Sequence, residues 1–241
     1  MSVEVFRTRA ALAGSAAAAL AEVLQRRRRP VLLLPAGRTA VPVYRELVRL
    51  HRTGRAPMAR ATTFNLDELR VPPEDPRSFR SFMDRHLFSR VDLPESRIRF
   101  LQGDAKDPER ECARYERRLA REGPPDLAFV GIGVNGHVAY LEPARALPPR
   151  TSLVHLSAAT RRRLTQDGVR RVPREALTVG LETILACPAI LLVAAGREKA
   201  TAVAAALEGP VTPRCPASFL TVHPGLSVML DRAAASGLAS S

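Results

Sequence analysis

The segment DLAFVGIGVNGHVAYLEP, residues 126–143, joins a short apolar run to a glycine-rich turn, a histidine and a glutamate. Residues 127–130 predict a buried strand, and the glycines of the turn allow a substrate to approach the backbone closely. His137 and Glu142 would lie at the rim of such a site. A histidine there is suited to proton transfer, because its ordinary pKa is near neutrality. The alternative is that His137 is a loop residue satisfied by local hydrogen bonds.

Two other apolar runs are also followed by residues that could do chemistry. Residues 30–37, PVLLLPAG, precede Thr39 and a helical pattern, and backbone N–H groups with a hydroxyl at a helix N-terminus are suited to bind phosphate. Residues 61–65, ATTFN, precede Asp67 and Glu68, and one of these carboxylates is a candidate base. The alternatives are that Thr39 only caps the helix, and that Asp67 and Glu68 only lie in a solvated loop.

Ligands of parallel α/β sheets bind beyond the carboxyl ends of the strands. The three strand ends therefore predict one pocket, suited to acid/base chemistry on a small phosphorylated molecule. Lys199 strengthens the anion site. Of the 37 lysines and arginines, only Lys106 and Lys199 are lysines, and all the others are arginines. A lysine after the apolar run 189–194 therefore indicates a position that needs a compact charge.

Five motifs resemble the glucosamine-6-phosphate deaminase family in order and spacing. They are FNLDE at 64–68, SFM at 81–83, GIGVNGHVAYLEP at 131–143, ALTVG at 176–180 and EGPVTPRCPASFLTVHP at 208–224. The wider superfamily includes 6-phosphogluconolactonase. The resemblance implies a three-layer αβα sandwich with a Rossmann-like, mainly parallel sheet, similar to ribose-5-phosphate isomerase and CoA-transferase-like folds. It also implies no metal and no organic cofactor.

The resemblance further implies a reaction, in which glucosamine 6-phosphate becomes fructose 6-phosphate and ammonia. The steps are ring opening, proton transfer from C2 toward C1, and loss of the amine. By resemblance, Asp67 is the base at C2, His137 assists ring opening and Glu142 orients the histidine. Asn135, where the family often has Asp, cannot act as a base and is expected only to form hydrogen bonds. The implied phosphate contacts are Gly37, Arg38, Thr39, Lys199 and one arginine of the run 161–163, assigned to Arg163.

Three positions depart from the family pattern as the resemblance defines it. Arg38 replaces Gly or Ser, Leu69 replaces a Tyr after the acidic pair, and Leu141 replaces an Asn before Glu-Pro. A 6-phosphogluconolactonase-type hydrolase and a non-catalytic sugar-phosphate-binding protein therefore remain alternatives. Control by N-acetylglucosamine 6-phosphate is not expected, because the basic residues of regulated members are missing after Thr151. The chain is expected to be a monomer or a homo-oligomer.

Composition favours one domain over residues 1–241, since 241 residues with 46% hydrophobic content suffice for a full α/β core. Three scattered cysteines without a CxxC pair favour a reducing cytoplasm and argue against structural zinc. No apolar run reaches the roughly 18 residues that span a bilayer, so no membrane partner is expected.

The net charge of +13 attracts anionic sugar phosphates. With 5% aromatic residues and no nucleic-acid-binding motif, no nucleic-acid partner is expected.

Apolar and amphipathic segments alternate along the chain, as is typical of parallel α/β proteins. Strands are predicted at residues 3–6, 31–34, 61–65, 98–101, 127–131, 177–180, 189–194 and 227–230. Helices are predicted at residues 9–28, 40–53, 78–88, 107–122, 157–165 and 197–207.

Overall fold

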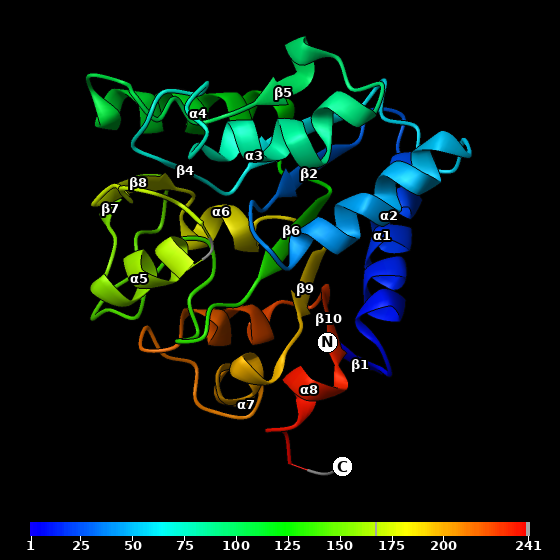
Figure 1. The fold of residues 1–241 in the computed structure, drawn as a ribbon, viewed down its shortest axis with the longest axis vertical. Helices are drawn as coiled ribbons and strands as arrows, with labels where there is room; N and C mark the ends of the chain where they lie inside the picture. The colour runs from blue at the N-terminus through cyan, green and yellow to red at the C-terminus, as the bar shows by residue number, and fades with distance from the viewer. Residues whose placement is uncertain (167, 240–241) are drawn as a thin grey trace.

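A seven-stranded parallel sheet forms the centre of the computed structural model, which describes residues 1–166 and 168–239 (Figure 1). Its strand order is β1-β10-β9-β6-β2-β3-β5. The strands are β1 (Ser2–Phe6), β2 (Val31–Leu34), β3 (Thr62–Asn65), β5 (Ile98–Arg99), β6 (Leu127–Gly131), β9 (Ile190–Ala194) and β10 (Leu226–Asp231).

The strand order reverses between β2 and β6. From β2 the chain continues through β3 to β5 at one edge, and it then returns to pair β6 with the other side of β2. From β6 it proceeds outward through β9 and β10. The loops after β2 and β6 thus diverge at this point, which is where open α/β sheets bind ligands.

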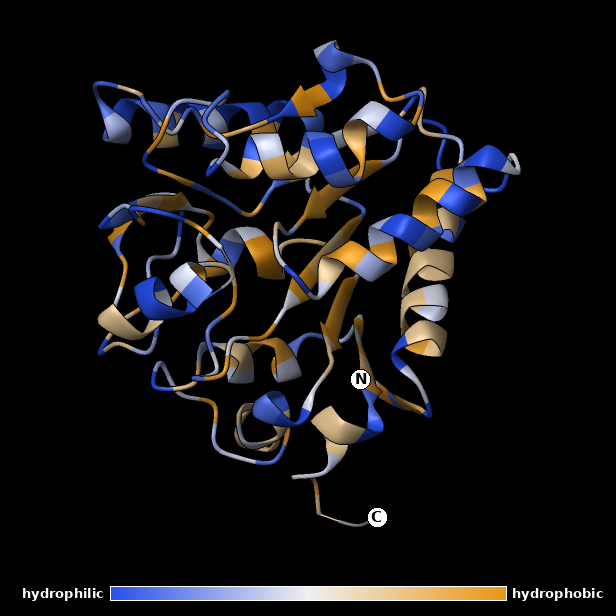
Figure 2. Cartoon of the chain, viewed as in Figure 1, coloured by the Kyte–Doolittle hydropathy of each residue, from blue (hydrophilic) through white to orange (hydrophobic). Residues whose placement is uncertain are grey.

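Helices cover both faces of the sheet, and the alternation of side chains along β2 shows why. Leu32 and Leu34 pack in one core with α1 (Arg9–Arg26) and α2 (Ala40–Arg52), whereas Leu33 packs in a second core on the opposite face. The second core is closed by α4 (Pro108–Glu122), α6 (Leu181–Leu185) and α7 (Ala200–Leu207). Hydrophobic strands therefore lie inside and hydrophilic helix faces outside (Figure 2). The predicted three-layer αβα architecture is confirmed.

A second, three-stranded antiparallel sheet has the order β4-β8-β7, formed by β4 (Asp67–Leu69), β8 (Glu175–Thr178) and β7 (Ser152–His155). The sequence pattern predicted neither β4 nor β7, and the strand predicted at 177–180 begins two residues earlier in the structure. A three-residue strand has no periodicity to detect, and pairing with β8 is what forms it. Asp67 and Glu68 consequently lie in a strand, 6% and 1% exposed, and the solvated-loop interpretation of them is wrong.

The predicted helices are confirmed to within a few residues, although that of 197–207 is divided into a 3₁₀ turn, η3 (Arg197–Lys199), and α7. The sequence pattern did not predict α6, α8, η2 or η4. No helix in the described part of the chain is long and apolar enough to cross a membrane. The remaining elements are α3 (Phe79–His86), α5 (Ala158–Gln166), α8 (Arg232–Ala235), η1 (Phe88–Arg90), η2 (Glu95–Arg97) and η4 (Pro216–Val222).

Candidate active site

The strand ends that the sequence assigned to one pocket belong to β2, β3 and β6, and β3, which precedes Asp67, pairs with β2. The strand before Lys199, β9, lies next to β6. β6 pairs with β2 on one side and with β9 on the other, all in parallel. Their carboxyl ends lead into residues 36–39, which we call the phosphate loop, into the glycine turn before His137, and into the turn that carries Lys199. The three groups of candidate residues therefore start from the same edge of the sheet.

His137 is held by Asn135. The side-chain Oδ1 of Asn135 lies 2.7 Å from Nδ1 of the imidazole and also accepts the backbone N–H of His137 at 3.3 Å. An amide oxygen can only accept hydrogen bonds, so Oδ1 of Asn135 accepts from both of these nitrogens of His137, and Nδ1 carries the ring proton. Nε2 then presents its lone pair. Burial and then the positive charge of Lys199 lower the pKa of His137 to about 4, while Glu142 opposes this shift.

Glu142 acts on His137 through charge. Its Oε1 accepts the backbone N–H of Ser157 at 3.1 Å, at the start of α5. By resemblance Glu142 was expected to orient the imidazole, but the hydrogen bond that orients the ring in the structure comes from Asn135. Glu142 instead connects the histidine loop to α5.

Asp67 is joined to the histidine loop through Thr178. In the small sheet Asp67 lies opposite Thr178 of β8, and the Thr178 hydroxyl accepts the backbone N–H of Tyr140 at 3.1 Å. Burial, followed by the charge of Glu68, raises the pKa of Asp67 well above its usual range. Its Oδ1 is buried without a hydrogen-bond partner among the described residues. Such a carboxylate is a strong proton acceptor held in place by strand pairing.

Glu68 fixes the start of α3. Its Oε1 accepts the N–H groups of Leu69 at 2.8 Å and Phe79 at 2.6 Å, and its Oε2 accepts that of Arg80 at 2.8 Å. Burial raises its pKa to about 7 against the lowering effect of these bonds. The ring of Phe79 stacks on Tyr140 of the histidine loop, with centroids 5.9 Å apart. Glu68 therefore ties β4, α3 and the histidine loop together.

Lys199 is positioned by Asp231 at the end of β10. The Asp231 carboxylate accepts the N–H of Gly196 at 3.0 Å, and the C=O of Gly196 accepts the N–H of Lys199 at 3.0 Å. Gly196 has φ +99°, a backbone conformation that residues with a Cβ rarely adopt. The turn that delivers Lys199 thus requires glycine.

The remaining phosphate candidates differ in exposure. Arg38 is exposed and Thr39 is half-buried. The Thr39 hydroxyl makes no capping bond to α2, so the helix-cap interpretation is wrong. Arg163 lies 3.9 Å from the carboxylate of Glu198. Arg161 has its Nε buried with no partner in the part of the chain that the structure describes.

A sequence profile of the family described as Glucosamine-6-phosphate isomerases/6-phosphogluconolactonase matches residues 7–228. The chain belongs to this family. Among curated members, glucosamine-6-phosphate deaminase 1 of Giardia intestinalis is 41% identical over 216 residues, covering 88% of this chain and 81% of the relative. Glucosamine-6-phosphate deaminase of Bacillus velezensis is 38% identical, covering 98% of this chain and 100% of the relative.

Solved structures agree with this assignment. A monomeric glucosamine-6-phosphate deaminase superposes with a TM-score of 0.95 at 37% identity, covering 98% of this chain and 100% of that one. A 6-phosphogluconolactonase from Thermotoga maritima has a TM-score of 0.76 at 22% identity, with 95% and 98% covered, and shares the fold. The deaminase branch of the family is thus the more similar one.

Two of the three departures from the family pattern are packing residues. Leu69 is fully buried in the cluster that contains Phe79 and Tyr140, and Leu141 is buried in the main core. Only Arg38 has an exposed side chain. Of the three substitutions, therefore, only Arg38 offers a new group to a ligand.

Sequence reasoning missed residues that position the site from a distance. Thr178 lies within the ALTVG motif, where its hydroxyl interrupts an apolar strand, and that interruption was the available signal. Asp231 ends the apolar strand 226–230 in the same way. Both side chains act on backbone groups remote in sequence, so only the fold reveals their partners.

Proposed function

We propose that this protein is a glucosamine-6-phosphate deaminase that releases ammonia from glucosamine 6-phosphate and forms fructose 6-phosphate. One observation carries the proposal. A buried carboxylate with a raised pKa, Asp67, is connected through Thr178 to the loop of a neutral histidine, His137, near the charge of Lys199. A purely binding function would not need a base placed in this way, and the greater similarity to deaminases favours deamination over lactone hydrolysis.

His137 is suited to open the sugar ring. With the proton on Nδ1 held by Asn135, the Nε2 lone pair accepts the proton of the C1 hydroxyl and returns it to the ring oxygen as the C1–O5 bond breaks. The lowered pKa keeps the imidazole neutral near pH 7, so it begins the step as a base. Glu142 stabilises the protonated form through its charge during the transfer.

Asp67 is suited to move the proton between C2 and C1. Its raised pKa makes it a better base for carbon than an exposed aspartate, and the same group can return the proton to C1. The C2–N bond then becomes an imine, water adds to C2, and ammonia leaves. Fructose 6-phosphate is the remaining product.

The substrate phosphate is proposed to bind Gly37, Arg38, Thr39, Lys199 and an arginine of α5. The unpartnered Nε of Arg161 and the proximity of Arg163 to Glu198 support Arg161 as that arginine, in place of Arg163. We also propose that residues 1–241 act as one domain, and the similarity to a monomeric glucosamine-6-phosphate deaminase supports a monomer over a homo-oligomer. The three buried free cysteines support a reducing, cytoplasmic location.

The deciding experiment measures ammonia release from glucosamine 6-phosphate beside hydrolysis of 6-phosphogluconolactone. The purified protein is expected to release ammonia, and Asp67→Asn to lose a factor on the order of 10²–10⁴ in kcat while retaining substrate-analogue binding within a few-fold. Lactone hydrolysis without ammonia release, or full activity in the Asp67→Asn variant, would contradict the proposal.

A further inference from the structure

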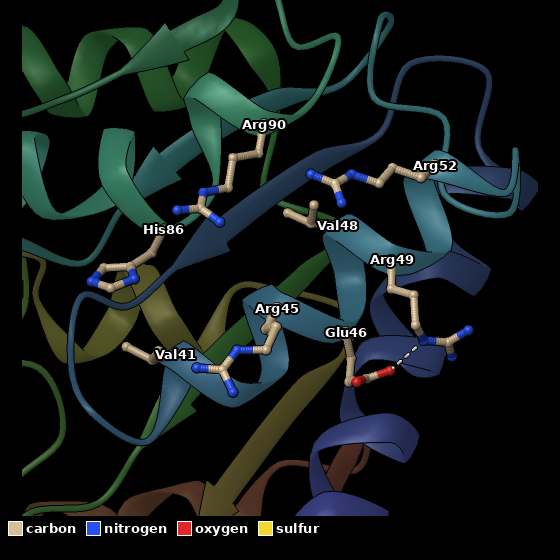
Figure 3. Close-up of a pocket in the computed structure, with 8 residues that line it drawn as sticks. All are labelled: Val41, Arg45, Glu46, Val48, Arg49, Arg52, His86 and Arg90. Atoms are coloured by element: carbon tan, nitrogen blue, oxygen red, sulfur yellow. Dashed lines mark hydrogen bonds and ion pairs between the residues drawn. The ribbon is translucent and has the colours of Figure 1, made fainter.

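A groove of about 450 Å³ lies between α2 and the segment that runs from α3 into η1 (Figure 3). None of Asp67, His137 or Lys199 lines it. We call it the arginine groove, because most of its polar lining is guanidinium. Its lining residues are Val41, Arg45, Glu46, Val48, Arg49, Arg52, His86 and Arg90.

The sequence of α2 explains how one wall forms. Val41, Arg45, Val48 and Arg52 are spaced by four, three and four residues, which places them on one stripe of the helix. The two valines give the wall an apolar surface, and Arg45 and Arg52 lie about 10 Å apart along the helix axis. The opposite wall adds Arg90 of η1, so charges from two segments face one concavity.

The positive charge of the groove is poorly compensated by the protein. Glu46 is the one carboxylate of the lining, and it pairs with Arg49 at 2.7 Å, with the Arg49 side chain turned toward it (Figure 3). Within residues 1–166 and 168–239, Arg45, Arg52 and Arg90 form no ion pair with a carboxylate. Nε of Arg90 donates to a backbone oxygen at 2.9 Å, and its two terminal nitrogens extend beyond that bond.

The potential in the groove also affects His86. Burial, and then the charges of Arg85, Arg90 and Arg45, lower the pKa of its imidazole. Three guanidinium groups are thus close enough to the histidine to disfavour one more positive charge. A region that repels a proton in this way attracts an anion.

We propose that the arginine groove binds a small anion that carries two or more phosphoryl groups, at a site distinct from that for the sugar phosphate. Guanidinium groups bind phosphate oxygens through paired N–H donors. Three of them, of which Arg45 and Arg52 are spaced about 10 Å apart along α2, exceed what one phosphate requires. The volume falls within the roughly 300–1,000 Å³ of small-molecule pockets, which favours a compact ligand over a polymer.

Calorimetric titration of the intact protein with inorganic tripolyphosphate tests the proposal. We expect one saturable site, weakened on the order of 100-fold by Arg45→Ala with Arg52→Ala and about 10-fold by Arg90→Ala, since each charge-assisted bond contributes about a factor of 10. The control variant, Arg28→Ala with Arg29→Ala, removes the same charge from exposed positions after α1. It should change the affinity less than ~2-fold, and both double variants should release ammonia at the unaltered rate.

Four outcomes would overturn the proposal. They are the absence of saturable binding, equal losses in the two double variants, loss of tripolyphosphate binding in Lys199→Ala, and tighter binding of a short single-stranded RNA to the same arginines. The Lys199→Ala result separates this groove from the proposed active site, so the two proposals can fail independently.

Discussion

Asp67 and His137 have pKa values displaced in opposite directions, and neighbouring side chains account for part of each displacement. The Asp67 carboxyl is raised by burial and by Glu68, whereas the His137 imidazole is lowered by burial and by Lys199. A carboxylate made more basic and an imidazole kept neutral are both ready to accept a proton. At the scale of single residues, substitution of Asn135 should therefore change the pKa of His137, and substitution of Glu68 should change the pKa of Asp67.

Asn135→Asp should raise the pKa of His137. The substitution places a carboxylate on the ring nitrogen that Asn135 now contacts at 2.7 Å, and a negative charge at that distance stabilises the imidazolium. NMR titration of the His137 ring should show a midpoint above the value of about 4 set by the native environment. Asn135→Ala, which adds no charge, is the control and should stay near the native midpoint. A midpoint in the Asn135→Asp variant at or below the native one would contradict this account of the site.

Glu68→Gln should move the acid limb of the kcat/KM profile to lower pH. Ionised Glu68 raises the pKa of Asp67, so removing its charge lowers that pKa and leaves the base deprotonated at more acidic pH. Glutamine keeps an oxygen for the N–H groups of Leu69 and Phe79, while the N–H of Arg80 loses its acceptor, so thermal unfolding of the variant is measured beside its activity. Glu142→Gln serves as the comparison, because its charge acts on His137 instead. An acid limb that stays in place or moves to higher pH in Glu68→Gln would exclude this coupling.

At the scale of elements, the sequence predicted what depends on local pattern and missed what depends on pairing. The buried strands β2, β6 and β9 are continuous apolar runs, so they and the loops after them were placed correctly. β4 begins with the acidic residues Asp67 and Glu68, and nothing local marks it as a strand. Its partner β8 lies more than 100 residues away. The same holds for the hydrogen bond between Thr178 and Tyr140, which joins residues 38 positions apart in the sequence.

Gly133→Ala should impair catalysis without unfolding the protein. A Cβ at Gly133 would clash with Cε1 and Nδ1 of His137, so the imidazole must move. A misplacement of about 1 Å can reduce kcat by a factor on the order of 10². Gly14→Ala, in the interior of α1 with nothing within 4 Å of the added Cβ, is the matched control. It should leave kcat unchanged and increase the free energy of unfolding by about 0.5–1 kcal/mol in urea titrations. Equal kcat values for the two variants would show that His137 tolerates the displacement.

At the scale of the whole molecule, the charge of +13 is spread far beyond the candidate active site. Residues 26–29 are exposed at the end of α1 and just after it, whereas Lys199 is half-buried next to His137. Salt separates these two contributions. At 0.15 M ionic strength the Debye length is about 8 Å, so distant exposed charges are screened while a direct contact is not.

Lys199→Ala should therefore weaken glucosamine 6-phosphate binding by about 1.5–3 kcal/mol, the contribution of a charge-assisted hydrogen bond, at both low and physiological salt. Arg28→Ala with Arg29→Ala removes twice the charge from exposed positions. Its effect should be small at low salt and vanish near 0.15 M, because nothing holds those side chains against the substrate. Isothermal titration of the native protein and both variants at two salt concentrations measures the difference. Comparable losses in the two variants, or a Lys199→Ala effect that disappears with salt, would mean that diffuse charge holds the phosphate in place of the contacts formed by Lys199 and the phosphate loop.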